Sequence, residues 1–185
     1  MLGQHRAADG LLDFGCGCGR VIRHWESRSD LHGCDHDAEA IRWCREHLAF
    51  ASFERHGLEP PLPYPDQRFG AVTAISVFTH LPEEAQAAWR DELRRVLAPG
   101  GLLVLTTHGE RYVDRFSDEE RARFEAGHLV VRRPAAAGTN LCTAFHPERY
   151  VRDVLADGFE LLEFRPGGAT GTPTQDLAVL RVVCR

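Results

Sequence analysis

Three glycines alternate with two cysteines directly after an apolar run, in the segment Asp13-Phe14-Gly15-Cys16-Gly17-Cys18-Gly19. Glycine adopts positive φ without steric cost and lets a ligand approach the main chain closely. The pattern of apolar residues predicts a buried strand over 10–15 and a helix over 20–28, so the glycines fall in the turn between them. In an open parallel sheet, the first turn of this kind is a usual place for a nucleotide-like ligand.

Two classes of cofactor fit such a turn. A dinucleotide needs glycine or alanine at the sixth position, so that its pyrophosphate can rest on the helix N-terminus. Counting from Gly15, the sixth position is Arg20, which departs from that pattern. The alternating glycines, with Asp13 two residues before the first of them, suit a zwitterionic amino-acid tail better than a pyrophosphate. The glycines alone also fit a structural turn.

A second acid follows about 20 residues later, where ribose-binding acids stand in such folds. Asp35 ends the predicted strand 30–35, and a carboxylate there can accept hydrogen bonds from two ribose hydroxyls. Asp37 competes for this role, but it directly precedes the predicted helix 38–47, which indicates an N-cap. Dinucleotides and S-adenosylmethionine both contain such a ribose.

The elements that must position these residues alternate between strand and helix as far as residue 107, which predicts a parallel sheet covered by helices on both faces. After the loop 56–68, with its four prolines, Pro99-Gly100-Gly101 marks the stop of the second long helix. Further strands are predicted at 48–54, 69–77, 102–107, 129–132, 159–164 and 177–184, and further helices at 83–97, 118–126 and 147–156, with a loop at 167–174.

Composition restricts the partners. The net charge of −5 over 185 residues provides no field that attracts nucleic acid or anionic lipid. No run approaches the roughly 20 apolar residues that span a bilayer, and residues 1–10 lack the apolar core of a signal peptide. We therefore expect a cytoplasmic protein with no membrane partner. The six cysteines lack the spacing of zinc ligands, so we expect reduced, structural thiols and no metal.

Four segments, in this order, resemble motifs of class I S-adenosylmethionine-dependent methyltransferases. The resemblance covers roughly residues 10–108 and implies a Rossmann-like three-layer αβα sandwich, with a seven-stranded, mostly parallel sheet and an antiparallel last strand. It also implies S-adenosylmethionine as cofactor. The segments are Leu11-Leu12-Asp13-Phe14-Gly15-Cys16-Gly17-Cys18-Gly19-Arg20, Leu62-Pro63-Tyr64-Pro65-Asp66-Gln67-Arg68-Phe69, Ser76-Val77-Phe78-Thr79-His80-Leu81 and Leu93-Arg94-Arg95-Val96-Leu97-Ala98-Pro99-Gly100-Gly101.

The resemblance also implies roles for individual residues. The glycine loop would line the methionine tail, with Asp13 bracing the loop or reaching the amino group of the tail. Arg20 would pair with the methionine carboxylate or remain a solvated arginine. Asp35 would hold the ribose and His36 the adenine. The cofactor-binding set is Asp13, Gly15, Cys16, Gly17, Gly19, Arg20, Asp35, His36, Gly57, Leu58, Ser76 and Val77, with His56 where the family often has an amide or acid.

Methyl transfer is an in-line displacement in which the protein aligns the reactants and excludes water. A hydroxyl or ammonium nucleophile also needs a base to take its proton. The candidates are His80, His108 and His146, with Thr107 and Tyr150 as further pocket residues. His80 could instead pack under the cofactor, and His146, before Pro147, could serve as a cap.

We expect a single domain over 1–185, made of a cofactor-binding core (10–108), a lid or substrate segment (109–147) and a C-terminal helix with a β-hairpin (148–185). The family usually has covering helices before the first motif, where this sequence has about ten residues. A homo-oligomer or a partner subunit could cover the site instead.

The expected function is methyl transfer to oxygen or nitrogen of a small-molecule acceptor. The alternative is a non-catalytic cofactor-binding partner subunit, or a trimmed domain that needs another chain. Arg20 disfavours an NAD-dependent oxidoreductase. The lack of an Asn-Pro-Pro-aromatic motif and of a basic face disfavours nucleic-acid methylation.

Overall fold

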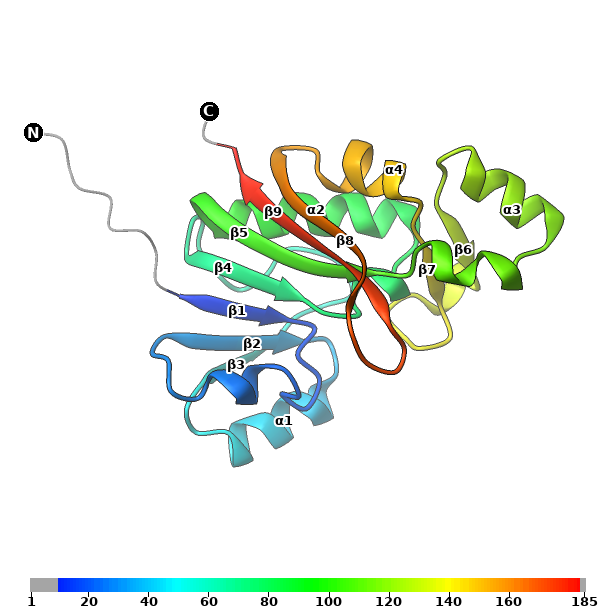
Figure 1. Cartoon of the computed structure of the whole chain (residues 1–185). Coiled ribbons are helices and arrows are strands. Elements are labelled where there is room, and N and C mark those ends of the chain that lie inside the picture. Colours follow the sequence, from blue (N-terminus) through cyan, green and yellow to red (C-terminus); the bar gives the residue numbers. More distant parts are fainter. Residues whose placement is uncertain (1–9, 184–185) are drawn as a thin grey trace, which may run out of the picture.

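The structure is a computed structural model that describes residues 10–183. Its centre is a seven-stranded sheet (Figure 1). The strands are β1 (Leu11–Phe14), β2 (Leu31–Asp35), β3 (Ser52–Arg55), β4 (Phe69–Ala74), β5 (Leu97–Thr107), β8 (Phe159–Ala169) and β9 (Gln175–Val182). The predicted strand 177–184 therefore starts earlier, and its last residue lies outside the described part of the chain.

The order of the strands is β3-β2-β1-β4-β5-β9-β8. Neighbouring strands from β3 to β5 are parallel, whereas β9 runs antiparallel to both β5 and β8. This confirms the expected fold class. The order reverses between β1 and β4, and in such sheets the carboxyl ends of the strands open a crevice at the point of reversal.

Two long helices cover opposite faces of the sheet (Figure 1). α1 (Ala38–His47) begins at Asp37, whose side chain accepts hydrogen bonds from the backbone N–H groups of Glu39 and Ala40, which confirms the expected N-cap. α2 (Glu83–Val96) buries Trp89 against Phe14 of β1, with ring centroids 4.8 Å apart. Alternate residues of each strand thus contact different helices.

The predicted helix 20–28 is wrong in extent, because only a short 3₁₀ helix, η1 (Ile22–Trp25), forms there. The chain takes positive φ at Gly19 and again at Asp30, and the residues between them on either side of η1 form turns and bends. The Arg23 side chain reinforces this stretch by donating to the backbone carbonyls of Cys18 and Gly19 at 2.9 and 3.0 Å.

Residues 109–147 form a small unit beside the sheet (Figure 1). It contains η3 (Glu110–Arg115), α3 (Asp118–Glu125), β6 (Val130–Arg132), η4 (Pro134–Ala136) and β7 (Thr143–Phe145). β6 and β7 pair antiparallel, and Phe116, Phe124, Val130 and Phe145 form their own apolar cluster. The chain then continues through α4 (Glu148–Tyr150) and the π-helical turn η5 (Val151–Leu155), close to the predicted helix 147–156.

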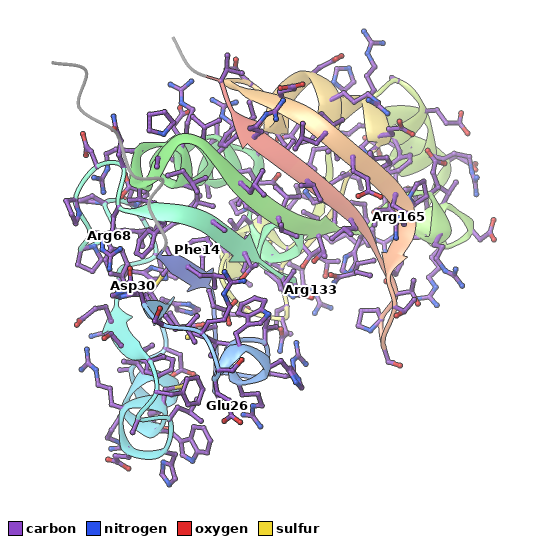
Figure 2. All side chains as sticks on the ribbon, turned by 60° about the vertical axis from the view of Figure 1, so that its left-hand side comes forward. Phe14, Glu26, Asp30, Arg68, Arg133 and Arg165 are labelled. Carbon is purple, nitrogen blue, oxygen red and sulfur yellow. The ribbon has the colours of Figure 1, made fainter. Side chains whose placement is uncertain are left out.

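An ion pair fixes the start of β2 against β4 on the edge of the sheet opposite the crevice. The Arg68 guanidinium donates two hydrogen bonds to the Asp30 carboxylate, at 2.8 and 2.5 Å. Figure 2 shows both side chains at this end of the molecule. The two side chains are partly exposed, so we expect the ion pair to contribute little to the free energy of unfolding and to act mainly on the alignment of the two strands.

Candidate active site

The glycine loop leaves β1 in a left-handed backbone conformation that favours glycine. Gly15 and Gly17 have φ of +71° and +51°, a region that other residues rarely adopt. A Cβ atom on Gly15 would lie 2.4 Å from Cγ2 of Val77, whereas a Cβ on Gly17 would meet nothing within 4 Å. The loop thus packs tightly against Val77 at its first glycine and exposes main chain to open space at its second.

Asp35 fastens this loop to the end of β2. Its Oδ2 accepts a hydrogen bond from the Gly17 N–H at 2.8 Å, and its Oδ1 accepts one from the Asp37 N–H at 2.9 Å. The Nδ1 atom of His36 lies 3.2 Å from the same Oδ1. A carboxylate has about four lone-pair positions, so Asp35 keeps acceptor capacity for a ligand hydroxyl.

Asp13 lies under the loop rather than at its surface. It is 1% exposed, and its Oδ1 accepts a hydrogen bond from the Thr73 hydroxyl at 2.9 Å. Its Oδ2 has no hydrogen-bond partner among the described residues. Burial raises the pKa of Asp13 to about 6, and the Thr73 hydrogen bond acts in the opposite direction. The position fits the bracing role among the two that we expected.

Cys16 is also beneath the loop. Its thiol and that of Cys44 both donate to the Gly17 carbonyl, at 3.5 and 3.3 Å. Burial raises the pKa of the Cys16 thiol above its usual range, so it stays neutral and packs as a small apolar residue. Gly19 packs against Leu48. Within residues 10–183, no group of three or more His, Cys, Asp or Glu side chains could hold a metal ion.

A cavity of about 120 Å³, the smaller cavity, opens beside the loop. It brings together seven of the residues that we expected to bind the cofactor: Gly15, Asp35, His36, Gly57, Leu58, Ser76 and Val77. Sequence reasoning missed other lining residues, namely Phe14, Leu81, Trp89 and Gly138. Phe14, Leu81 and Trp89 cannot be told from ordinary core residues by their sequence pattern. Gly138 is far from the cofactor motifs in the sequence, so no local pattern indicates it.

His56 forms part of the aromatic wall of this cavity. Its ring stacks on Phe14, with centroids 5.2 Å apart and planes 24° apart. Its Nδ1 donates to the Gly57 carbonyl at 2.6 Å, because a carbonyl oxygen can only accept. Burial lowers the pKa of His56. In the neutral ring Nε2 is therefore an acceptor, and it has no partner among the described residues.

A larger cavity, of about 600 Å³, lies on the other side of Ser76 and His80, and these two residues line both cavities. Ser76 has a φ of +60°, an unusual conformation for a residue other than glycine. The remaining lining residues are Arg20, Ile75, His108, Asn140, Ala169, Thr170, Gly171, Thr172, Pro173 and Gln175. Of these, sequence reasoning singled out Arg20 and His108 but neither Asn140 nor Gln175.

The structure separates the three candidate histidines. His80 and His108 line the larger cavity. His146 has no exposed surface, lines neither cavity and donates through Nε2 to the Gln86 side-chain oxygen at 3.1 Å. Burial lowers its pKa to about 3. His146 is therefore a core residue, because β7 turns it toward α2 instead of the crevice. Thr107 and Tyr150 are buried as well and line neither cavity.

His80 is held in one orientation. Its Nδ1 donates to the Cys142 carbonyl at 2.8 Å, so Nε2 carries the lone pair in the neutral ring. Nε2 of His108, by contrast, lies 3.2 Å from Nε2 of the Gln175 amide. Burial, with a smaller effect from His80, lowers the pKa of His108 to about 4. Of the two, His80 is the one whose lone pair no residue among 10–183 engages.

Residues 133–142, which we call the strap, cover part of both cavities. Gly138 lines the smaller cavity, and Asn140 lines the larger one. The Gly138 N–H donates to the His80 carbonyl at 2.9 Å. A Cβ on Gly138 would lie 2.9 Å from Cδ2 of Leu58, across the smaller cavity. The strap belongs to the segment 109–147 expected to form a lid, and that role stays a prediction.

Comparison with known proteins agrees with this geometry. A family model described as a methyltransferase domain matches residues 11–101. A sterol 24-C-methyltransferase of Gibberella zeae is 27% identical over 174 residues, which are 89% of this chain and 43% of that protein. A tRNA N(3)-cytidine methyltransferase of Gallus gallus is 26% identical over 132 residues, 65% of this chain and 34% of that protein. The chain thus spans less than half the length of these curated relatives.

Among solved structures, an S-adenosylmethionine-dependent methyltransferase of Methanosarcina mazei superposes with a TM-score of 0.73 at 22% identity, covering 97% of this chain and 95% of that one. The similarity extends over the whole sheet, including the antiparallel hairpin. Residues 11–101 thus match a methyltransferase domain and the whole chain has the fold of S-adenosylmethionine-dependent methyltransferases, which is consistent with the class I superfamily and supports S-adenosylmethionine as its cofactor.

Proposed function

We propose that this protein transfers a methyl group from S-adenosylmethionine to an oxygen or nitrogen atom of a small-molecule acceptor. The observation that carries the proposal is that two cavities meet at Ser76 and His80. One has the residue types that suit a nucleoside, and the other is lined by polar side chains, several apolar residues and one arginine. A transfer reaction needs two adjacent binding spaces, so that the methyl carbon and the nucleophile can come into contact.

The residues of the smaller cavity fit the adenosine part of the cofactor. Asp35 lines this cavity, and its carboxylate keeps acceptor capacity for a ribose hydroxyl. Gly17 is not among the lining residues, but it has open space where a Cβ would lie. The unpartnered Nε2 of His56 is an acceptor that suits the amino group of adenine. When bound, S-adenosylmethionine supplies a methyl carbon activated by its positive sulfur. We place Arg20 near the carboxylate of the methionine tail.

His80 is the proposed base. A hydroxyl nucleophile loses its proton during methyl transfer, and a side chain with a free lone pair must accept it. Nδ1 of His80 is held by the Cys142 carbonyl, which leaves Nε2 to act. The same logic orients the base in hydrolase triads, where a fixed group sets the tautomer of the histidine.

A small acceptor is favoured over a nucleic acid. One curated relative is named for a sterol and the other for a tRNA, so their names do not decide between a small molecule and a nucleic acid. The larger cavity, about 600 Å³, has the size of an ordinary small-molecule site. The net charge of −5 opposes the binding of a polyanion. No helix within residues 10–183 has the length and apolar character that crossing a membrane requires. The cytoplasmic location stays a prediction.

Calorimetric titration of the purified chain with S-adenosylmethionine, S-adenosylhomocysteine and NAD is the first test. We expect both sulfur compounds to bind and NAD to leave the heat unchanged, and binding of NAD alone would contradict the proposal. Turnover of radiolabelled S-adenosylmethionine with a panel of phenols, amines and carboxylic acids follows. Binding without turnover of any acceptor would favour the alternative, a cofactor-binding subunit that needs another chain.

A further inference from the structure

A buried polar cluster lies where the parallel part of the sheet meets the C-terminal hairpin. It consists of Ser76, Thr106, His108 and Gln175, and we call it the junction cluster. Thr106 has no exposed surface, and Gln175 is 4% exposed. Burying an amide is costly unless its hydrogen-bonding groups are satisfied. The hydrogen bonds of the junction cluster therefore decide which way the Gln175 amide points, and this direction decides which of its atoms can reach a ligand.

The two hydroxyls of the cluster fix the oxygen of Gln175. The Thr106 hydroxyl accepts a hydrogen bond from the Ser76 N–H at 2.8 Å, so its own hydrogen is free to go to Oε1 of Gln175, 2.5 Å away. The Ser76 hydroxyl donates to the same oxygen at 2.9 Å. Both lone pairs of Oε1 are thus used, and Nε2 points to the opposite side.

On that side, Nε2 lies 3.2 Å from Nε2 of His108. Because burial keeps the pKa of His108 near 4, the ring is neutral at pH 7 and accepts one amide hydrogen through Nε2. The amide has a second hydrogen, and no hydrogen bond within residues 10–183 engages it. Gln175 and His108 both line the larger cavity, so a donor remains available beside the place where the acceptor would bind.

The charged and polar residues that line the larger cavity also favour an acceptor with an oxygen atom. None of its lining residues among those described is Asp or Glu, and Arg20 is the one with a fixed charge. The cavity offers N–H donors from the Asn140 and Gln175 amides. The Thr170 and Thr172 hydroxyls also line it, and they can donate or accept. N–H donors recognise oxygen atoms with lone pairs. Because we assign Arg20 to the methionine carboxylate of the cofactor, a cationic acceptor is disfavoured by the lack of any Asp or Glu among the described lining residues that could pair with it.

We propose that Gln175 selects the acceptor by donating its second amide hydrogen to an oxygen atom of that molecule, and that His108 is the positioning residue that aims this amide. The acceptor is then a small molecule with a carbonyl, carboxamide or carboxylate oxygen beside its nucleophile, and not a cationic amine. This assignment rests on the proposed function, because it places the acceptor in the larger cavity.

The test uses the full chain loaded with S-adenosylhomocysteine and three probes of similar shape: benzoate, benzamide and benzylammonium. The Gln175 side-chain amide resonance is followed by ¹H–¹⁵N NMR, assigned by its loss in Gln175→Met. We expect benzoate and benzamide to shift this resonance and to bind about tenfold more tightly than benzylammonium. Equal or tighter binding of benzylammonium, or no shift at Gln175 with any probe, would overturn the assignment.

Two variants separate recognition from folding. Gln175→Met removes the donor at similar volume, so the preference for the oxygen-bearing probes should disappear. Gln175→Glu keeps an oxygen for Ser76 and Thr106 and replaces the amide nitrogen by a negatively charged oxygen. It should reverse the order, with benzylammonium bound more tightly than benzoate. A merely loosened fold would weaken all three probes alike, and that result would also count against Gln175 as the selecting residue.

Two further variants test the role of His108 and serve as control. His108→Asn retains an acceptor for the amide and should keep the order of the probes, whereas His108→Phe should lose it. Thr174→Val changes the neighbour of Gln175 on the same hairpin, outside the lining of the larger cavity, and should change nothing. If S-adenosylhomocysteine does not bind the unaltered protein, the proposed function fails. If it binds but the probes rank otherwise, only the assignment of Gln175 fails.

Discussion

The Nδ1 atom of His80 lies 2.8 Å from the carbonyl oxygen of Cys142, in the strap. The strap is also bound to the backbone of the same residue, because the Gly138 N–H donates to the His80 carbonyl at 2.9 Å. One histidine thus connects the wall shared by the two cavities to the segment that covers them. This arrangement sets the tautomer of His80 and makes it the first residue to test.

Replacing His80 by asparagine keeps an N–H for the Cys142 carbonyl and removes the basic nitrogen. We expect kcat toward a hydroxyl acceptor to fall by about 100-fold or more, with the Kd for S-adenosylmethionine nearly unchanged. Single-turnover kinetics and calorimetry measure the two quantities. His24→Asn, on the exposed surface, is the matched control. Turnover that survives in His80→Asn would remove this residue from the mechanism.

Gly17→Ala should lower the affinity for the cofactor much more than the stability of the fold. A Cβ there contacts no protein atom within 4 Å, so the protein bears only the strain of a left-handed alanine, about 1 kcal/mol. We expect the added methyl group to occupy space that the methionine tail of the cofactor needs. Gly100→Ala is the control, since Gly100 also has positive φ and open space around it. Equal cofactor affinity in the two variants would contradict this.

Asp13→Asn should stabilise the fold above pH 6. Burial raises the pKa of Asp13 from 3.8 to about 6, so the folded state binds the proton more tightly than the unfolded state, and stability falls as the pH rises through this window. The ionised carboxylate then costs about 3 kcal/mol at pH 7. Asparagine avoids this cost and keeps an oxygen for Thr73.

Urea denaturation between pH 4 and 8 measures the effect of Asp13→Asn. The gain should shrink to about 0.5 kcal/mol near pH 4, where the folded carboxyl group is protonated and the unfolded one, with a pKa of 3.8, is only partly ionised. Asp114→Asn, at an exposed position, should show no such profile. A gain that is equal at pH 4 and pH 8 would mean that it arises from packing instead of ionisation.

His108 should make the protein sensitive to acid. Its pKa is lowered from 6.5 to about 4, so the unfolded state binds the proton more tightly and stability falls as the pH drops through this window. The expected loss is about 3 kcal/mol at the lower end. In His108→Gln, which keeps an acceptor for Gln175, the curve of unfolding free energy against pH should be flatter. An unchanged slope would contradict it, and His24→Gln provides the comparison.

Local pattern was sufficient for the parts of the site that lie near β1 and β2. The apolar run before Gly15 predicts β1, and an acid that ends the next strand must lie beside the glycine loop, because parallel neighbours end at the same edge. Asp35 and Gly17 are accordingly joined by a hydrogen bond of 2.8 Å. Periodicity was likewise sufficient for α1 and α2, whose buried faces are long enough to repeat.

The other half of the site depends on pairings between distant segments, which no local pattern specifies. Gln175 reaches Thr106 only because β9 pairs with β5 in the register that sets Thr106 opposite Leu177. β7 is three residues long, too short for alternation to indicate it, and its pairing with β6 turns His146 into the core. The predicted helix at 20–28 is wrong in extent, and apolar spacing also gives no sign of the Arg23 hydrogen bonds to main-chain carbonyls that reinforce this stretch.

The strap has a consequence for which step limits the rate of the reaction. Because the strap covers part of both cavities and is hydrogen-bonded twice to His80, we expect release of the spent cofactor to require that these hydrogen bonds break. Release of S-adenosylhomocysteine, and not methyl transfer itself, would then limit the steady-state turnover rate. A burst of methylated product in the first turnover, followed by a slower linear phase, would be its kinetic signature.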